Sequence, residues 1–84
     1  TKERIKAMKS VRVSNVPTMC SEVDILGVFS SFGEIVSVNS SHEAKTPFLE
    51  YHIQFANDED AIEAVSNMHM TEFLGRILTC TIFE

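Results

Sequence analysis

The segment Phe48-Leu49-Glu50-Tyr51-His52-Ile53-Gln54-Phe55 contains the alternation on which the fold prediction rests. Tyr51, Ile53 and Phe55 alternate with polar residues, and a period of two is typical of a strand with one buried face. By the same parity, Glu50 and His52 are expected on the opposite face. The segment therefore predicts a strand that is buried on one side and carries polar side chains on the other.

Further strands are indicated by alternating apolar residues at 11–17, 35–40 and 77–83. Apolar residues at i, i+3, i+4 and i+7 predict one helix from the N-cap Ser21 to Gly33 and another that begins near Asn57. The order βαββαβ predicts an α+β, ferredoxin-like domain, with a four-stranded antiparallel sheet, two helices on one face and the other face open. We expect residues 1–10 to form a basic arm and residues 11–84 to form the domain.

Charge is divided unevenly along the chain. Residues 1–10 contain four basic side chains and one acidic (+3), and the remainder contains three basic and eleven acidic (−8), which sum to the formal net charge of −5. An acidic body repels phosphate, so nucleic-acid binding would require its few cations on one face.

Cysteine and histidine placement argues against enzymatic or metal chemistry. Cys20 is expected before a helix and Cys80 inside a strand, which does not favour a disulfide, and reduced thiols fit an intracellular protein. Copper-carrying ferredoxin-like proteins need two thiolates in the first strand-to-helix loop, where this chain has one. Acyl phosphatases need an arginine in that loop, and residues 17–21 contain none. His42, His52 and His69 lack metal-ligand spacing.

The chain has no stretch long and apolar enough to span a bilayer. Because it begins with threonine rather than methionine, we expect it to be a piece of a longer protein. The prediction is a binding module without enzymatic activity, cofactor, metal or membrane contact.

Four segments in order resemble the RNA recognition motif family and together cover residues 10–84. Residues 11–17 resemble its first-strand signature, and residues 29–35 resemble its F-x-x-F-G-x-I helix exit. Residues 75–78 match its G-R-x-L pattern before the last strand, and the second helix matches at Ala61, Ala64, Val65 and Met68. Residues 67–76 are also similar, more weakly, to the motif attached to a nuclear cyclophilin.

The resemblance implies a sheet face that binds single-stranded RNA by stacking bases on rings. Three positions that are aromatic in the family are Arg12, Glu50 and His52 in this chain. Base stacking on an aromatic ring contributes about 1–3 kcal/mol per base. Because these rings are missing, we expect the affinity for RNA to be modest. Rings, a planar cation and hydrogen-bonding side chains are expected to contact RNA at Arg12, Asn39, Phe48, His52, Thr79, Thr81 and Phe83.

These positions also admit purely structural roles. Arg12 and Glu50 could form an exposed ion pair across neighbouring strands. His52 could be a solvated strand residue, and the outward phenylalanines could pack under a loop or the arm. Asn15 and Arg76 are expected to stabilise the strand exit and the sheet edge rather than contact RNA.

The alternative function is a protein-interaction module that has lost RNA binding. An acidic body with outward apolar residues, such as Leu26 and Ile62, suits a basic or hydrophobic partner. One peptide-binding subclass of the family carries R-x-F before the last strand, where this chain has Thr71-Glu72-Phe73, and is therefore not favoured. In either role we expect an intracellular protein, in the nucleus rather than the cytoplasm.

Overall fold

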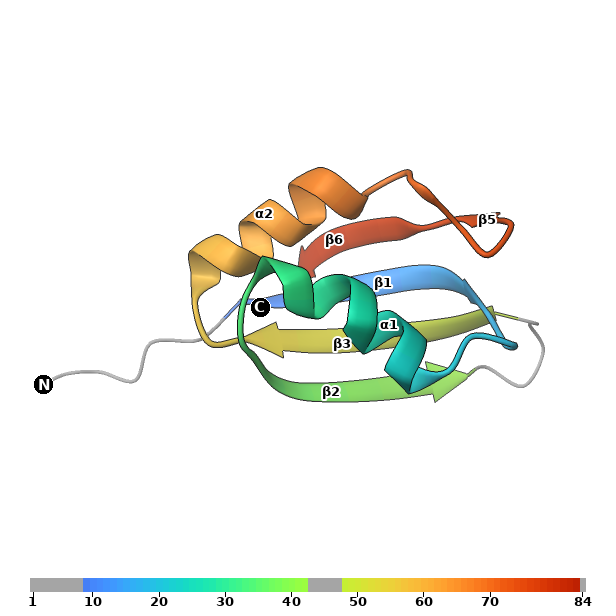
Figure 1. The fold of residues 1–84 in the computed structure, drawn as a ribbon, viewed down its shortest axis with the longest axis horizontal. Helices are drawn as coiled ribbons and strands as arrows, with labels where there is room; N and C mark the ends of the chain where they lie inside the picture. The colour runs from blue at the N-terminus through green and yellow to red at the C-terminus, as the bar shows by residue number, and fades with distance from the viewer. Residues whose placement is uncertain (1–8, 43–47, 84) are drawn as a thin grey trace, which may run out of the picture.

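A computed structural model describes residues 9–42 and 48–83 of the chain. Its elements follow the order seen in Figure 1: β1 (Ser10–Pro17), α1 (Glu22–Phe29), the 3-10 turn η1 (Ser30–Phe32), β2 (Ile35–His42), β3 (Phe48–Phe55), α2 (Asp58–Met68), β4 (Glu72–Phe73), β5 (Arg76–Ile77) and β6 (Thr79–Phe83).

The main sheet has four strands in the order β2-β3-β1-β6, and every neighbouring pair is antiparallel. Both helices pack on one face, because Ile25 and Phe29 of α1 and Ala61 and Ala64 of α2 join the inward side chains of the strands in one core (Figure 1). The predicted α+β, ferredoxin-like architecture is confirmed.

The core is built by the alternation that the sequence displays. Tyr51, Ile53 and Phe55 of β3 are buried, as are Leu78 and Cys80 near the start of β6. Complete burial of a valine, isoleucine or phenylalanine side chain stabilises the fold by about 1.5–3 kcal/mol. The same period leaves the odd-numbered residues of β6 exposed, and it fixes which side chains reach the open face.

The first helix begins as predicted and ends earlier. The Asp24 backbone N–H donates to Oγ of Ser21 at 3.2 Å and the Ser21 N–H donates to Oδ2 of Asp24 at 3.1 Å, a reciprocal capping box. The sequence predicts helix through Phe32, whereas α1 ends at Phe29 and the chain tightens into η1. Such 3-10 turns are common at helix ends.

Gly33 follows η1 and lets the first turn of α2 approach closely. A Cβ atom at Gly33 would lie 2.7 Å from Cβ of Asp60 and nearer still to its carboxylate. The absence of a side chain at Gly33 therefore permits the contact between the two helical segments.

Two strand boundaries differ from the prediction. β2 extends to His42, two residues beyond the predicted end, and β6 begins at Thr79 rather than at residue 77. Arg76–Ile77 pairs with Glu72–Phe73 in a separate hairpin, whose turn residues Leu74 and Gly75 have φ of 51° and 86°. Positive φ at both central residues is typical of a tight hairpin turn. The backbone N–H of the next residue, Leu78, donates to the Thr71 carbonyl at 2.8 Å, and the Leu78 carbonyl accepts from the Met70 N–H at 2.8 Å. Both backbone groups of Leu78 are therefore hydrogen-bonded to the segment after α2.

The predicted basic arm falls largely on residues 1–8, outside the described residues. Lys9 is described, and its backbone N–H donates to Oδ1 of Asp58 at 2.9 Å, which ties the start of β1 to the start of α2. Cys20 and Cys80 are both free and buried. Within residues 9–42 and 48–83, no helix is long and apolar enough to cross a membrane and no three acidic, histidine or cysteine side chains are placed to share a metal ion.

Candidate nucleic-acid interface

A row of four side chains crosses the sheet on the face away from the helices. Asn39 of β2 pairs with His52 of β3, His52 pairs with Arg12 of β1, and Arg12 pairs with Thr81 of β6. Register partners in antiparallel strands share a face. The row therefore brings together four of the residues predicted to contact RNA.

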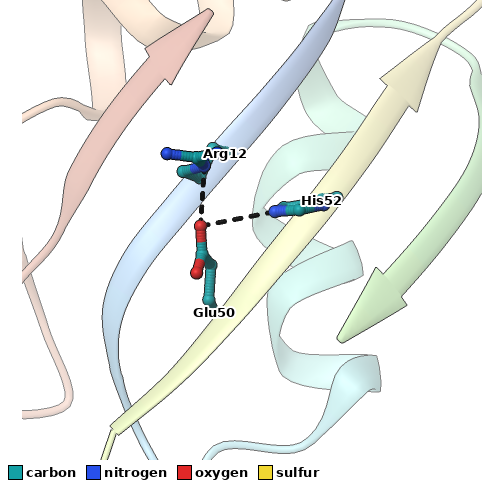
Figure 2. Close-up of polar contacts among 3 residues, drawn as sticks. All are labelled: Arg12, Glu50 and His52. Carbon is teal, nitrogen blue, oxygen red and sulfur yellow. Dashed lines mark hydrogen bonds and ion pairs between the residues drawn. The ribbon is translucent and has the colours of Figure 1, made fainter. Parts of the chain in front are cut away.

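Glu50 joins the two central members of this row. Its Oε2 lies 2.7 Å from Nε of Arg12 and 3.3 Å from Nε2 of His52. Figure 2 shows Arg12 on β1 and His52 on β3 meeting at the Glu50 carboxylate, with α1 behind the sheet. The ion pair that the sequence suggested between Arg12 and Glu50 is present.

This ion pair is a modest stabilising element. The side chains of Arg12 and Glu50 are 42% and 34% exposed, and exposed pairs of this kind contribute about 0–1 kcal/mol. Nε of Arg12 is itself buried, and despite its proximity to Oε2 it makes no hydrogen bond with any described residue. The contact is therefore an ion pair without a well-aligned N–H donor.

Phe83 lies beside the row and contacts two of its members. Its ring centroid lies 5.0 Å from that of His52 with the planes 30° apart, and 4.8 Å from Cζ of Arg12. Both spacings fall within the ranges for aromatic and cation–π contact. Phe83 pairs with Ser10 at the end of the sheet and is 40% exposed. We call Arg12, His52 and Phe83 the ring platform.

A second cluster lies at the opposite end of β1. Cζ of Arg76 lies 4.1 Å from the ring centroid of Phe48, and its Nη2 donates to Oδ1 of Asn15 at 3.1 Å. Asn15 in turn donates from Nδ2 to the carbonyl of Ile77 at 2.8 Å. Asn15 therefore stabilises the strand exit, as predicted, and holds Arg76 against Phe48.

Backbone geometry explains why Asn15 can make both contacts. The register of β1 against β3 shifts between Val13 and Val16, and Asn15 within this bulge has φ of 68°. Asparagine tolerates the left-handed region better than most residues. The bulge turns Asn15 toward β5, which the sequence pattern did not predict because neither the irregular register nor the β4–β5 hairpin was foreseen.

A hollow of about 460 Å³ lies on the sheet surface next to this second cluster. Its lining combines rings, hydroxyls and one carboxylate, from Ser14, Asn15, Ser41, His42, Phe48, Leu49 and Glu50. The hollow is large enough for part of a nucleotide and extends the open face beyond the ring platform.

The predicted site residues therefore separate into two groups. Arg12, His52 and Phe83 form the ring platform, with Asn39 and Thr81 at the two ends of the central row. The remaining two lie toward the other end of the face, where Thr79 pairs with Ser14 and Phe48 pairs with Pro17. Arg76 was predicted as a sheet-edge cation, and its stacking on Phe48 adds it to the open surface.

The family is decided by a match that covers most of the sheet and both helices. Residues 11–79 match the family model described as "RNA recognition motif". The chain belongs to the RNA recognition motif family. The further similarity to the motif of a nuclear cyclophilin stays a prediction.

Curated relatives include Protein PES4 of Saccharomyces cerevisiae, 29% identical over 75 residues, which cover 89% of this chain and 12% of that protein. Human cleavage stimulation factor subunit 2 is 32% identical over 79 residues, which cover 87% of this chain and 13% of that protein. This RNA recognition motif thus spans about an eighth of the length of these relatives.

Solved RNA recognition motifs superpose closely on this one. The third motif of Pes4 has a TM-score of 0.83 at 29% identity, covering 89% of this chain and 90% of that chain. The Rna15 motif with bound RNA has a TM-score of 0.74 at 23% identity, covering 86% of this chain and 79% of that chain. At that identity, the likeness to Rna15 shows the fold alone.

Proposed function

We propose that this RNA recognition motif is a single-stranded RNA-binding module of modest affinity that acts within a larger protein. The observation that carries the proposal is the ring platform, in which Phe83 lies within 5.0 Å of both the His52 ring and the Arg12 guanidinium on the open face. Imidazole and guanidinium planes can stack on bases as aromatic rings do. Family membership favours RNA as the ligand.

In this mechanism, two or three unpaired bases lie along the open face. His52 and Phe83 provide stacking surfaces, and Arg12 adds a planar cation. Asn39 and Thr81, at the ends of the central row, hydrogen-bond to base edges, and Thr79 does so beside the hollow. Phe48, with Arg76 stacked on it, receives a base at the far end. Only single strands can present their bases in this way.

Glu50 limits the affinity. It stands at a position that is aromatic in the family, so one stacking surface worth about 1–3 kcal/mol is missing. Its carboxylate also repels phosphate and lies 2.7 Å from Nε of Arg12, whose charge it partly neutralises. The basic arm is proposed to supply attraction to phosphate, and it lies mostly outside the described residues.

The proposed role is binding, without enzymatic activity. We place the parent protein inside the cell and in the nucleus rather than the cytoplasm. The similarity to a cleavage stimulation factor subunit supports a context of RNA processing.

An NMR titration with short random oligoribonucleotides tests the proposal. The backbone amides of Arg12, His52 and Thr81 should shift together, while that of the exposed Ile62 on α2 should not. Binding should weaken steeply between about 50 and 200 mM salt as counterions are released. An unmoved sheet at about 1 mM oligonucleotide, ten times the weakest usual non-specific dissociation constant, would contradict RNA binding.

The second candidate function is a protein-interaction module without RNA binding. The observation that favours it is the central carboxylate of Glu50, which binds two of the groups that RNA would need. In that case the same titration with oligoribonucleotides would leave the open face unchanged.

A further inference from the structure

An apolar groove runs between α1 and β2 at the outer edge of the sheet, away from the ring platform. It measures about 560 Å³, and its lining includes Val23, Leu26 and Gly27 of α1 and Val36 and Val38 of β2. Val23 and Val36 are 76% and 55% exposed, so apolar side chains border the groove in contact with solvent. Figure 1 shows α1 crossing the face of the sheet diagonally, with its first turn nearest to β2.

β2 is an outer strand of the main sheet in the part of the chain that the structure describes, and it borders this groove. Among the described strands it pairs only with β3, and its eight residues include no proline and no acidic, lysine or arginine side chain. Exposed edge strands are usually protected by charges, proline or short length, because an unpaired edge accepts further strands. One register shift occurs, between Ile35 and Ser37, and residues 37–42 continue in regular pairing.

Gly27 is an unusual residue for the middle of α1. Glycine in a helix interior costs about 1 kcal/mol relative to alanine. A Cβ atom at Gly27 would have no neighbour within 4 Å, so packing within the described fold does not require glycine there. Because Gly27 lines the groove, its missing side chain leaves room there for a side chain of a bound partner.

The charges around the groove select its occupant. Glu22 and Asp24 lie in the first turn of α1, Glu34 precedes β2, and all three are exposed. Neither α1 nor β2 contains lysine or arginine. A second copy of this chain, with net charge −5, would bring like charge to the groove, and RNA would be repelled by the same carboxylates.

We infer that the α1–β2 groove binds an extended segment of a partner protein in which apolar and basic side chains alternate. The segment adds as a strand to the outer edge of β2 and forms backbone hydrogen bonds there. Its apolar side chains enter the groove over Gly27. The alternating basic side chains point to the other side of the added strand, where the acidic surface around the groove attracts them at longer range.

A model hexapeptide of alternating lysine and valine, blocked at both ends, probes the groove. Titrated into the 84-residue chain, it should shift the amides of the groove residues Gly27, Val36 and Val38, whereas a peptide of alternating glutamate and valine should not. Val36→Lys should weaken the lysine peptide by about tenfold through repulsion at the edge. Ile62→Lys adds the same charge on the exposed face of α2 and should leave binding unchanged.

The variant Gly27→Ala distinguishes an effect on peptide binding from an effect on the stability of the fold. This variant should resist urea better than the unmodified chain, since alanine favours the helix, and yet bind the lysine peptide about fivefold more weakly because its methyl group occupies the groove. Unimpaired binding by Gly27→Ala would overturn the inference. So would equal binding of both peptides, no response to either, or shifts of the groove amides caused by oligoribonucleotide. Dimerisation through β2 in the absence of peptide would assign the edge to a second copy and would also overturn it.

The two proposals fail independently, because the RNA titration reports on Arg12, His52 and Thr81, and the peptide titration reports on Gly27 and Val36, which line the groove and are not part of the proposed RNA site.

Discussion

Oε2 of Glu50 lies 2.7 Å from Nε of Arg12, diagonally across β3 and β1, and both residues occupy positions that are aromatic in the RNA recognition motif family. The guanidinium also lies 4.8 Å from the Phe83 ring. The cation at the centre of the open face is therefore held by a carboxylate and a ring, and RNA must compete with the carboxylate for it.

Removal of the Glu50 charge should strengthen RNA binding. Glu50→Gln keeps the size of the side chain, releases Arg12 and removes repulsion of phosphate, so the affinity for a labelled oligoribonucleotide should rise about three- to tenfold at low salt. Fluorescence anisotropy measures the change. Glu63→Gln is the matched control, because it removes the same charge from an exposed position on α2. Equal gains from both variants would contradict a local role for Glu50.

The Phe83 ring should contribute to RNA affinity far more than to stability. Phe83→Leu keeps an apolar side chain at the end of β6 but removes the surface against which His52 and Arg12 lie. The loss should be about 1–3 kcal/mol of binding free energy. Because Phe83 is 40% exposed, the free energy of unfolding should change by less than about 1 kcal/mol.

The control for this variant is Ile62→Ala, which truncates another exposed apolar residue on α2 and should leave RNA affinity unchanged. If Phe83→Leu binds RNA like the unmodified chain, the ring platform is not the binding surface.

Gly33 and Gly27 should respond in opposite ways to the same substitution. Gly33→Ala places a methyl group 2.7 Å from Cβ of Asp60 and should lower the free energy of unfolding by about 1–3 kcal/mol. Gly27→Ala meets no neighbour within 4 Å and should raise it by about 1 kcal/mol. Urea unfolding followed by circular dichroism compares the two, and a shift of the same sign in both would refute the packing argument.

Alkaline pH should destabilise the fold through Cys80. Burial raises the pKa of this thiol from 9.0 to about 11. Between these values the unfolded chain has released the proton and the folded chain has kept it, so stability is complete below pH 9 and falls as pH rises toward 11, by about 2 kcal/mol.

Urea midpoints at pH 8, 9 and 10.5 test this dependence, and Cys80→Val should reduce its slope. Some slope should persist in the variant, because burial also raises the pKa of Cys20 and of Tyr51. A midpoint independent of pH across this range would contradict the assignment.

The layout of the open face could be predicted from the sequence because strand alternation is strict. Once Tyr51, Ile53 and Phe55 are assigned to the core, the orientation of Glu50 and His52 follows, and the pairing of Arg12 with Glu50 could be anticipated. Local patterns also identify the cap at Ser21, since the Ser–Asp spacing permits reciprocal bonds.

The other end of the face could not be predicted from local patterns. The stacking of Arg76 on Phe48 depends on the bulge at Asn15 and on the β4–β5 turn, in which Leu74 adopts φ of 51°. Leucine is not favoured in that region, so no propensity indicates it. Irregular register and positive φ are set by long-range contacts, such as the bond from Asn15 to the Ile77 carbonyl.

The pairing of Ser10 with Phe83 has a practical consequence for engineering. Opposite residues of antiparallel strands have Cα atoms about 4.5–5.5 Å apart. The start of β1 and the end of β6 therefore lie close together. The domain could therefore be inserted into an exposed loop of a host protein without separating the two ends of that loop. Because Phe83 lies next to the insertion point, a ligand that binds the ring platform would act directly on the connection to the host. The inserted domain could therefore serve as a sensor for that ligand.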